Sequence, residues 1–93
     1  MVGVVIIVPG GTQEMYDKAM QDLKLTADGG NWPEGIISHN TGPSGSEWVV
    51  VDIWQSKEAF MKFLQERLGK AMKAAGLPAV EPKFFEVYLS HKS

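Results

Sequence analysis

Residues 47–63 read EWVVVDIWQSKEAFMKF and join a strand to a helix with almost no loop between them. The first half is rich in β-branched residues, which favour a pleated strand, and Trp48 and Trp54 add bulk near its two ends. Ser56 can accept a hydrogen bond from a free amide in the first turn of a helix. The segment therefore predicts a buried strand at 47–54 that is followed directly by a helix.

Further elements are predicted on both sides of this segment. The predicted order is a strand at 2–8, an amphipathic helix capped by Thr12, a loop at 26–34, a strand at 35–41, a turn at 42–46, the strand at 47–54, a helix at 57–75 ended by Gly76, and a strand at 81–89. The order βαββαβ, in a single domain spanning 1–93, predicts an α+β, ferredoxin-like fold. In this fold a four-stranded antiparallel sheet carries two helices on one face.

The predicted sheet has more apolar surface than two helices can cover. The first, third and fourth strands are apolar on both sides. An exposed apolar face of that size marks an interaction surface. We therefore expect a homodimer in which the uncovered faces of two sheets meet.

The length of the turn between the second and third strands decides which side chains share a face. A turn at 42–46 pairs His39 with Val49. His39 then faces the helices together with Ile37, Val49, Val51 and Ile53. The opposite set faces the partner subunit and contains Ile36, Ser38, Asn40, Trp48, Val50, Asp52 and Trp54. A register shift of one residue would regroup the two sets.

Composition excludes several classes of function. The chain has 9 Lys and Arg against 11 Asp and Glu and contains no basic block, so a nucleic-acid partner is not expected. The absence of cysteine excludes thiol nucleophiles, disulfides and cysteine-held metal clusters. The apolar run at the N-terminus is too short for a signal peptide or a membrane span, which predicts a cytoplasmic protein without membrane contact. The two histidines are far apart, so we expect no metal site.

His39 is the candidate catalytic residue. It is the only histidine inside a predicted strand, and a neutral imidazole can abstract a proton from a phenol or an activated carbon. The alternative is a structural histidine whose ring nitrogens bond to the backbone or to Tyr16. Asp52 could orient a histidine or a ligand, although a carboxylate on an inner strand is more often paired with a cation or placed at a sheet edge.

Other residues are candidates for the wall of a ligand pocket. Trp54 offers a flat apolar surface for an aromatic ligand, although aromatic residues also serve packing alone. Asn40 or Ser38 could donate a hydrogen bond to an oxyanion. Tyr16 either points into the pocket or buries its ring, and Trp32 either closes over the pocket or anchors its loop.

The segment DIWQSKEAFMKF, the strand GIISH and the βαββαβ order together resemble the antibiotic biosynthesis monooxygenase family of dimeric α+β barrel proteins. The resemblance implies a substrate pocket between sheet and helices in each subunit. It also implies, for the cofactor-free branch, deprotonation of a phenolic substrate that then reacts with O2. In the haem-degrading branch a tryptophan stands at the position of Phe63 and the iron-ligating histidine at that of Lys73, so haem is not expected. Phe63 is included in the expected substrate-binding wall.

Three hypotheses for function follow. The first is a cofactor-free monooxygenase-like enzyme for a small aromatic, quinol or polyketide-type compound, with His39 as the base. The second is a binding protein, cyclase or isomerase with the same cavity and no oxygen chemistry. The third is a structural or regulatory dimer, which gains support if the cavity is smaller than about 300 Å³.

Overall fold

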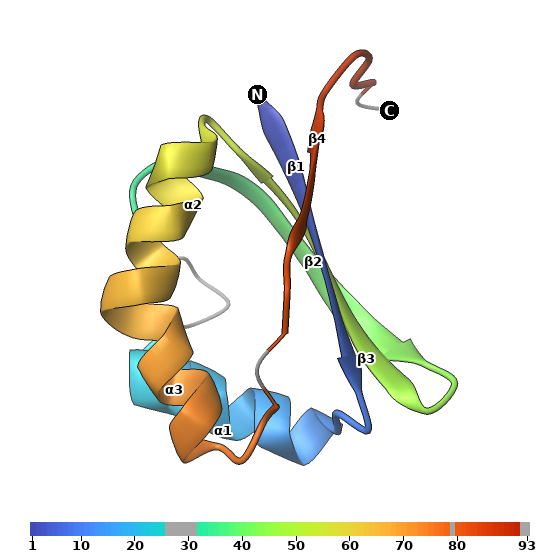
Figure 1. The fold of residues 1–93 in the computed structure, drawn as a ribbon, viewed down its shortest axis with the longest axis vertical. Helices are drawn as coiled ribbons and strands as arrows, with labels where there is room; N and C mark the ends of the chain where they lie inside the picture. Colours follow the sequence, from blue (N-terminus) through green and yellow to red (C-terminus); the bar gives the residue numbers. More distant parts are fainter. Residues whose placement is uncertain (26–31, 79, 92–93) are drawn as a thin grey trace.

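The computed structural model describes residues 1–25, 32–78 and 80–91. Its elements are, in chain order, β1 (Val2–Pro9), α1 (Gln13–Leu23), β2 (Ile36–Ser44), β3 (Glu47–Trp54), α2 (Lys57–Phe63), the π-helical turn η1 (Leu64–Leu68), α3 (Gly69–Ala74) and β4 (Lys83–Glu86) (Figure 1). The predicted βαββαβ order is thus confirmed. Most of the loop predicted at 26–34 lies outside the described residues.

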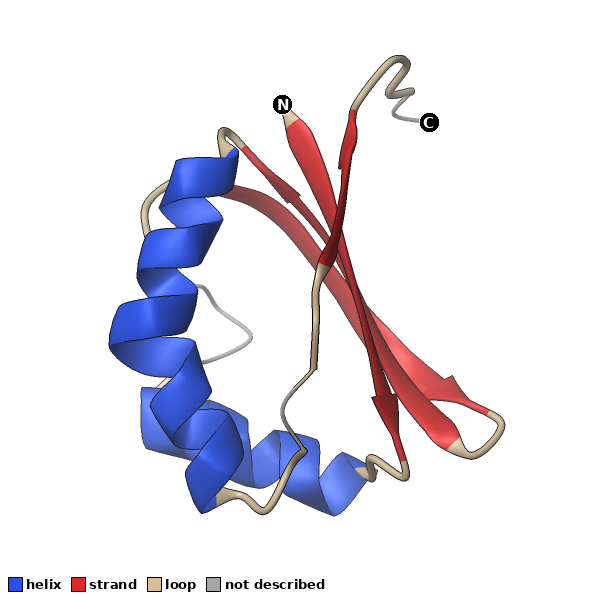
Figure 2. Ribbon diagram, in the orientation of Figure 1, coloured by secondary structure: helices blue, strands red, loops and turns tan. Residues whose placement is uncertain are grey.

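The four strands form one antiparallel sheet in the order β2-β3-β1-β4. All of the helical segments lie on the same side of this sheet (Figure 2). This arrangement is the predicted α+β, ferredoxin-like fold. Within the described residues, no helix is long and apolar enough to span a membrane.

The hairpin between β2 and β3 differs from the prediction. Its turn consists of Gly45 and Ser46 alone, and Ser44 pairs with Glu47. Gly45 has φ +60°, the positive value that a type II′ hairpin turn requires at its first central position. The shorter turn moves the pairing of His39 from Val49 to Asp52, a shift of three residues.

An odd shift in register exchanges the two faces of a strand relative to its neighbour. The prediction that β3 turns Val49, Val51 and Ile53 toward the helices is therefore wrong. The buried side chains of β3 are Trp48, Asp52 and Trp54, whereas Val51 is exposed. On β2, His39 is directed to the helix side, as predicted, because it pairs with the inward-facing Asp52.

The second helical segment runs almost as predicted and contains one irregularity. The Ser56 hydroxyl caps it by accepting a hydrogen bond from the amide of Ala59, and Gly76 ends it with φ +82°. In η1 the amide of Gly69 bonds to the carbonyl of Leu64, five residues back. A Cβ at Gly69 would lie 3.0 Å from that carbonyl oxygen, so a glycine allows this close approach.

The core lies between the inner face of the sheet and the helices. Its buried apolar residues are Val2, Val4, Ile6, Val8, Ala19, Leu23, Leu25, Trp48, Trp54, Phe60, Phe63 and Ala71. On the outer face no helix of the described residues covers the sheet, and Ile7, Val51 and Phe85 are 40%, 36% and 47% exposed. The inner and outer faces of the sheet are therefore both apolar, but only the inner one is buried within this chain.

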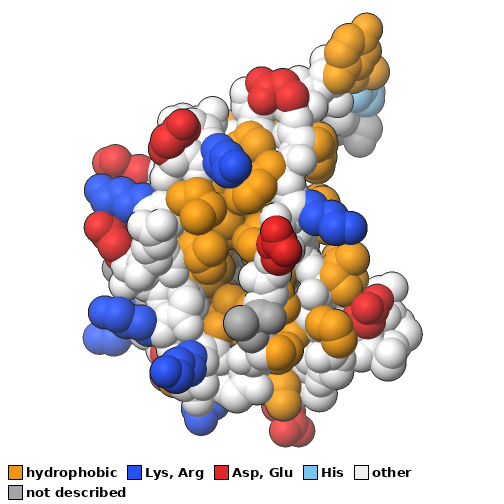
Figure 3. Space-filling model, viewed as in Figure 1, with side chains coloured by type: hydrophobic (Ala, Val, Ile, Leu, Met, Phe, Trp, Pro, Cys, Tyr) orange, Lys and Arg blue, Asp and Glu red, His pale blue; other side chains and the backbone are white. Residues whose placement is uncertain are grey.

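The edge strand β4 is shorter than the predicted strand at 81–89. Phe84 contacts Phe60 at a ring-centroid distance of 5.7 Å, and the ammonium of Lys57 lies 4.6 Å from the centre of the Phe84 ring. Beyond the strand, Tyr88 and Leu89 are exposed. Figure 3 shows hydrophobic side chains at the surface along β4 and between β4 and α2. The edge of the sheet therefore adds to the apolar surface of the subunit.

Candidate functional site

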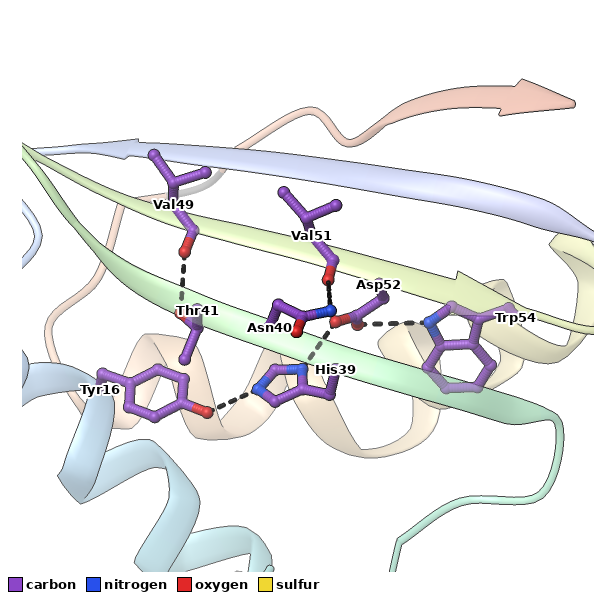
Figure 4. A network of polar contacts seen from close by, with 8 residues as sticks. All are labelled: Tyr16, His39, Asn40, Thr41, Val49, Val51, Asp52 and Trp54. Atoms are coloured by element: carbon purple, nitrogen blue, oxygen red, sulfur yellow. Dashed lines mark hydrogen bonds and ion pairs between the residues drawn. The ribbon is translucent and has the colours of Figure 1, made fainter. Parts of the chain in front are cut away.

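The β2–β3 hairpin brings an imidazole and a carboxylate together on the inner face of the sheet. His39 and Asp52 are paired across the two strands, and His39 Nδ1 lies 2.6 Å from Asp52 Oδ1 (Figure 4). A carboxylate only accepts hydrogen bonds, so Nδ1 of the imidazole carries the proton and donates it. In the neutral ring this leaves Nε2 as a hydrogen-bond acceptor.

Asp52 is held by a second donor on the same strand. The indole Nε1 of Trp54, two residues further along, donates to Asp52 Oδ2 at 3.3 Å. Asp52 is 5% exposed, and each of its oxygens accepts one hydrogen bond. A buried carboxylate needs such partners because burial removes its hydration. Trp54 and His39 together therefore fix the position of the Asp52 carboxylate.

Tyr16 completes the network from α1. Its hydroxyl lies 2.6 Å from His39 Nε2, and the two rings are nearly parallel, with an angle of 11° and a centroid distance of 6.1 Å. Burial, and then the negative charges of Asp52 and Asp17, raise the pKa of Tyr16 to about 12. The phenol is therefore neutral at physiological pH, and it is the donor in this bond whenever Nε2 carries no proton. The chain of bonds runs from Asp52 through His39 to Tyr16.

Two tryptophans lie against this network. The Trp32 ring is centred 5.0 Å from that of His39, and the Trp48 ring 5.4 Å from that of Tyr16. Aromatic pairs at these distances stabilise each other beyond simple burial. Tyr16 and His39 are thus held by aromatic contacts as well as by hydrogen bonds.

The network borders a cavity between the sheet and the helices. The cavity has a volume of about 60 Å³. Its polar or aromatic lining residues are Tyr16, Trp32, His39, Trp48, Asp52 and Phe63, and the rest of the lining is aliphatic or Met. Pockets for small organic ligands measure about 300–1,000 Å³. The present conformation therefore holds nothing larger than a few water molecules. This volume supports the third hypothesis, a structural or regulatory dimer, and a ligand can enter only if the side chains around the cavity rearrange.

The structure brings together four of the six predicted site residues. His39, Tyr16, Trp32 and Phe63 all line the cavity. Trp54 is fully buried below the network, against Phe60 and Phe63, and is not part of the lining.

Asn40 has a different position. It is exposed and its amide donates to the carbonyl of Val51 at 3.3 Å. Asn40 also pairs with Val51 in the ladder and follows the inward-facing His39, so it belongs to the outer face of the sheet. The prediction that Asn40 contacts a ligand in this cavity therefore has no support in its position.

Of the polar and aromatic residues of the cavity, Asp52 and Trp48 are not among the predicted site residues, although the sequence suggests Asp52 as a residue that could orient a histidine. A five-residue turn predicts that Asp52 and Trp48 face outward, whereas the two-residue turn of the structure turns them inward. The signal that could have placed them correctly is Gly45-Ser46, since glycine at the first position favours a two-residue turn. Within the described ranges, no group of three His, Asp or Glu residues could hold a metal ion.

Comparison with known proteins places the fold. No protein-family model matches the chain, and no curated protein matches it in sequence. A proposed antibiotic biosynthesis monooxygenase from Deinococcus radiodurans superposes with a TM-score of 0.67 at 12% identity, covering 100% of this chain and 98% of the other. This chain has the fold of that protein. The structural resemblance expected from the sequence is therefore confirmed.

Two further structures agree with this result. SnoaB, a cofactor-independent oxygenase from Streptomyces nogalater, superposes with a TM-score of 0.62 at 16% identity, covering 96% of this chain and 93% of the other. Rv0793 from Mycobacterium tuberculosis gives a TM-score of 0.66 at 15% identity, with coverage of 99% and 98%. These identities establish a shared fold and no more.

Proposed function

We propose that this chain is a cofactor-independent, monooxygenase-like enzyme for a small aromatic, quinol or polyketide-type compound, with His39 as its general base. The observation that carries the proposal is the Asp52–His39 pair, in which Nδ1 of the imidazole lies 2.6 Å from an oxygen of a buried carboxylate. The bond from Nε2 to the Tyr16 hydroxyl is the contact expected of a structural histidine, so the proposal requires that a substrate displace it. A base oriented by a buried carboxylate is an arrangement that recurs where proteins abstract protons. The resemblance of the fold to SnoaB, an oxygenase without cofactor, agrees with this chemistry.

The proposed reaction oxidises a methylene group flanked by phenolic rings. His39 Nε2 takes the hydroxyl proton of the enol form of the substrate, in which the former methylene carbon keeps one hydrogen, and becomes an imidazolium, which Asp52 stabilises. The charge of the enolate that forms is shared with this carbon. The substrate carbanion gives its electrons to O2, and the peroxide that forms takes up the proton from His39. Cleavage of the O–O bond with loss of the second substrate hydrogen gives a carbonyl and water. The net change converts the methylene group and one molecule of O2 into a ketone and one molecule of water, and the substrate is the only reductant.

Substrate binding requires a rearrangement of the site. The cavity of about 60 Å³ is too small for an aromatic compound, and the Tyr16 hydroxyl occupies the acceptor nitrogen of His39. In the proposal, the hydroxyl of the substrate replaces that of Tyr16 on Nε2. The exchange keeps the number of hydrogen bonds to His39 constant, but the displaced Tyr16 hydroxyl needs a new partner and the cavity must widen to admit the ligand.

Oxygen uptake with a panel of quinols and tricyclic phenols tests the proposal. The wild-type chain should consume O2 above the background rate, and His39→Ala should lose that activity by about 10²–10⁴-fold because the base is gone. The matched control is His91→Ala, since His91 is exposed and remote from the network. Uptake that survives His39→Ala would refute a role for His39 as the base.

A non-oxidative cyclase or isomerase is the second candidate. The three hydrogen-bonded groups, Asp52, His39 and Tyr16, are of the types that transfer protons. Proton transfer alone is sufficient for a cyclase or an isomerase, which supports this candidate. In that case a ligand raises the melting temperature and exchanges its acidic hydrogen with deuterium from solvent, without O2 consumption. If no compound of the panel binds, the hypothesis of a structural dimer is the one that remains.

We also propose that two copies of the chain form a homodimer through the outer face of the sheet. Support comes from the exposure of Ile7, Val51 and Phe85 on that face and from the small size of the subunit. A dimeric α+β barrel of this kind would bury these side chains. Light scattering coupled to size-exclusion chromatography should give twice the chain mass at micromolar concentration, and a stable monomer would refute the proposal.

A further inference from the structure

The indole N–H of Trp48 is a buried donor without a hydrogen-bond acceptor in the part of the chain that the structure describes. Trp48 is 7% exposed and lines the same cavity as Tyr16 and His39. A buried donor that stays unpaired carries a free-energy penalty. Such donors are rare in native proteins, and a functional role is one explanation for them. An unpaired donor in the wall of a ligand cavity points to an acceptor that arrives with the ligand.

The Tyr16 side chain indicates how an aromatic ligand would be oriented. Its ring lies 5.4 Å from that of Trp48 and 6.1 Å from that of His39, while its hydroxyl is 2.6 Å from His39 Nε2. Tyr16 therefore satisfies the aromatic contacts and the hydrogen bond of His39, but it offers no second oxygen for the Trp48 N–H. A ligand that replaces Tyr16 can supply that oxygen.

We infer that the cavity is a two-point recognition site for an aromatic hydroxy-ketone: the ligand hydroxyl donates to Nε2 of His39, and its carbonyl oxygen accepts from Nε1 of Trp48. Trp48 is then the residue that selects for the carbonyl, since a site with a buried donor discriminates against ligands that leave it unpaired. The inference rests on the proposed ligand cavity but requires no oxygen chemistry.

Two probes that differ in one carbonyl group test the inference on the wild-type chain. They are 5-hydroxy-1-tetralone and 5,6,7,8-tetrahydro-1-naphthol, which share the fused ring skeleton and the phenolic hydroxyl. The chain has three tryptophans, so a 15N-labelled sample gives three indole N–H signals, of which Trp48→Phe identifies one. The tetralone should shift the Trp48 signal in the direction of a stronger hydrogen bond, and the naphthol should not.

Calorimetric titration provides the matching affinity measurement. Trp48→Phe keeps an aromatic ring and removes the donor, so the dissociation constant of the tetralone should rise about tenfold while that of the naphthol stays unchanged. An equal effect on both probes, or tetralone binding with an unmoved Trp48 signal, would overturn the inference while leaving the proposed function intact. Binding of neither probe would overturn it together with the ligand cavity. Carbonyl-selective binding without O2 uptake would support it and refute the oxygenase alone.

Discussion

The two faces of the β2–β3 hairpin differ in the side chains that they bury and expose: the inner face buries a carboxylate, and the outer face leaves aliphatic side chains exposed. On the inner face the carboxylate of Asp52 and the imidazole of His39 lie beneath the helices, and on the outer face Val51 is 36% exposed. A monomeric domain is expected to bury aliphatic groups in preference to charged ones. The buried polar pair on the inner face agrees with the proposed proton chemistry, and the exposed apolar groups on the outer face agree with the proposed homodimer.

The largest expected effect comes from Asp52→Asn on the inner face. An amide can donate as well as accept, so the imidazole of His39 is no longer held with its proton on Nδ1, and Nε2 is lost as a base. Turnover should fall by about 10²–10⁴-fold, measured as kcat/KM in the oxygen-uptake assay. Asp22→Asn removes an exposed carboxylate on α1 and serves as the control. Full activity of Asp52→Asn would mean that the inner network is structural.

Most of the fold could be predicted from local sequence. The apolar run of β1, the Thr12 and Ser56 caps and the positive φ of Gly76 are properties of a few neighbouring residues, and the structure has all of them. The extent of the last strand could not be predicted in the same way. Its β-forming residues continue to Leu89, but strand pairing also requires a neighbour, and β1 pairs only as far as Glu86.

The candidate site could be predicted only in part, because its composition depends on the register of one hairpin. Residue type and the expected inward direction predict His39 and Tyr16 as site residues, and both line the cavity. Asp52 and Trp48 depend on a turn that was predicted three residues too long. Side chains alternate between the two faces along a strand. An error of three residues therefore places the Asp52 carboxylate on the face opposite to His39, whereas in the structure the two residues are paired on the same face.

The second prediction tests the outer face with Val51→Lys. An ammonium group buried between two sheets would lose its hydration without an opposite charge to replace it. The dissociation constant of the dimer should rise by about tenfold to 100-fold, observed by sedimentation velocity across a concentration series. Gln21→Lys adds the same charge to an exposed position of α1 and should leave assembly unchanged. A dimer of unchanged affinity would exclude this face as the interface.

The third prediction uses Gly3→Ala at the point where β1 pairs with β4 and Gly3 lies opposite Phe85. A Cβ at Gly3 would lie only 2.0 Å from the Phe85 ring, so the ring must move away. The unfolding free energy should fall by about 1–2 kcal/mol, measured by urea denaturation. In a Phe85→Ala background the ring that the added Cβ would meet is gone. Adding Gly3→Ala to Phe85→Ala should therefore lower the unfolding free energy much less than adding it to the wild type. Gly42→Ala is the matched control, because a Cβ there meets no atom within 4 Å.

The smallest expected effect returns to the inner face with Tyr16→Phe. Loss of the hydrogen bond to His39 should lower the unfolding free energy by about 1 kcal/mol at neutral pH. The pKa of Tyr16 is raised from 10.0 to about 12 in the folded chain, so the unfolded chain loses this proton first as the pH rises. The stability of the wild type should therefore fall between about pH 10 and 12 more steeply than that of Tyr16→Phe. Tyr88 is fully exposed, and Tyr88→Phe should keep the wild-type slope. Identical alkaline slopes in wild type and Tyr16→Phe would contradict this prediction. They would mean that burial beside Asp52 does not raise the pKa of Tyr16 in the folded chain above its value in the unfolded chain.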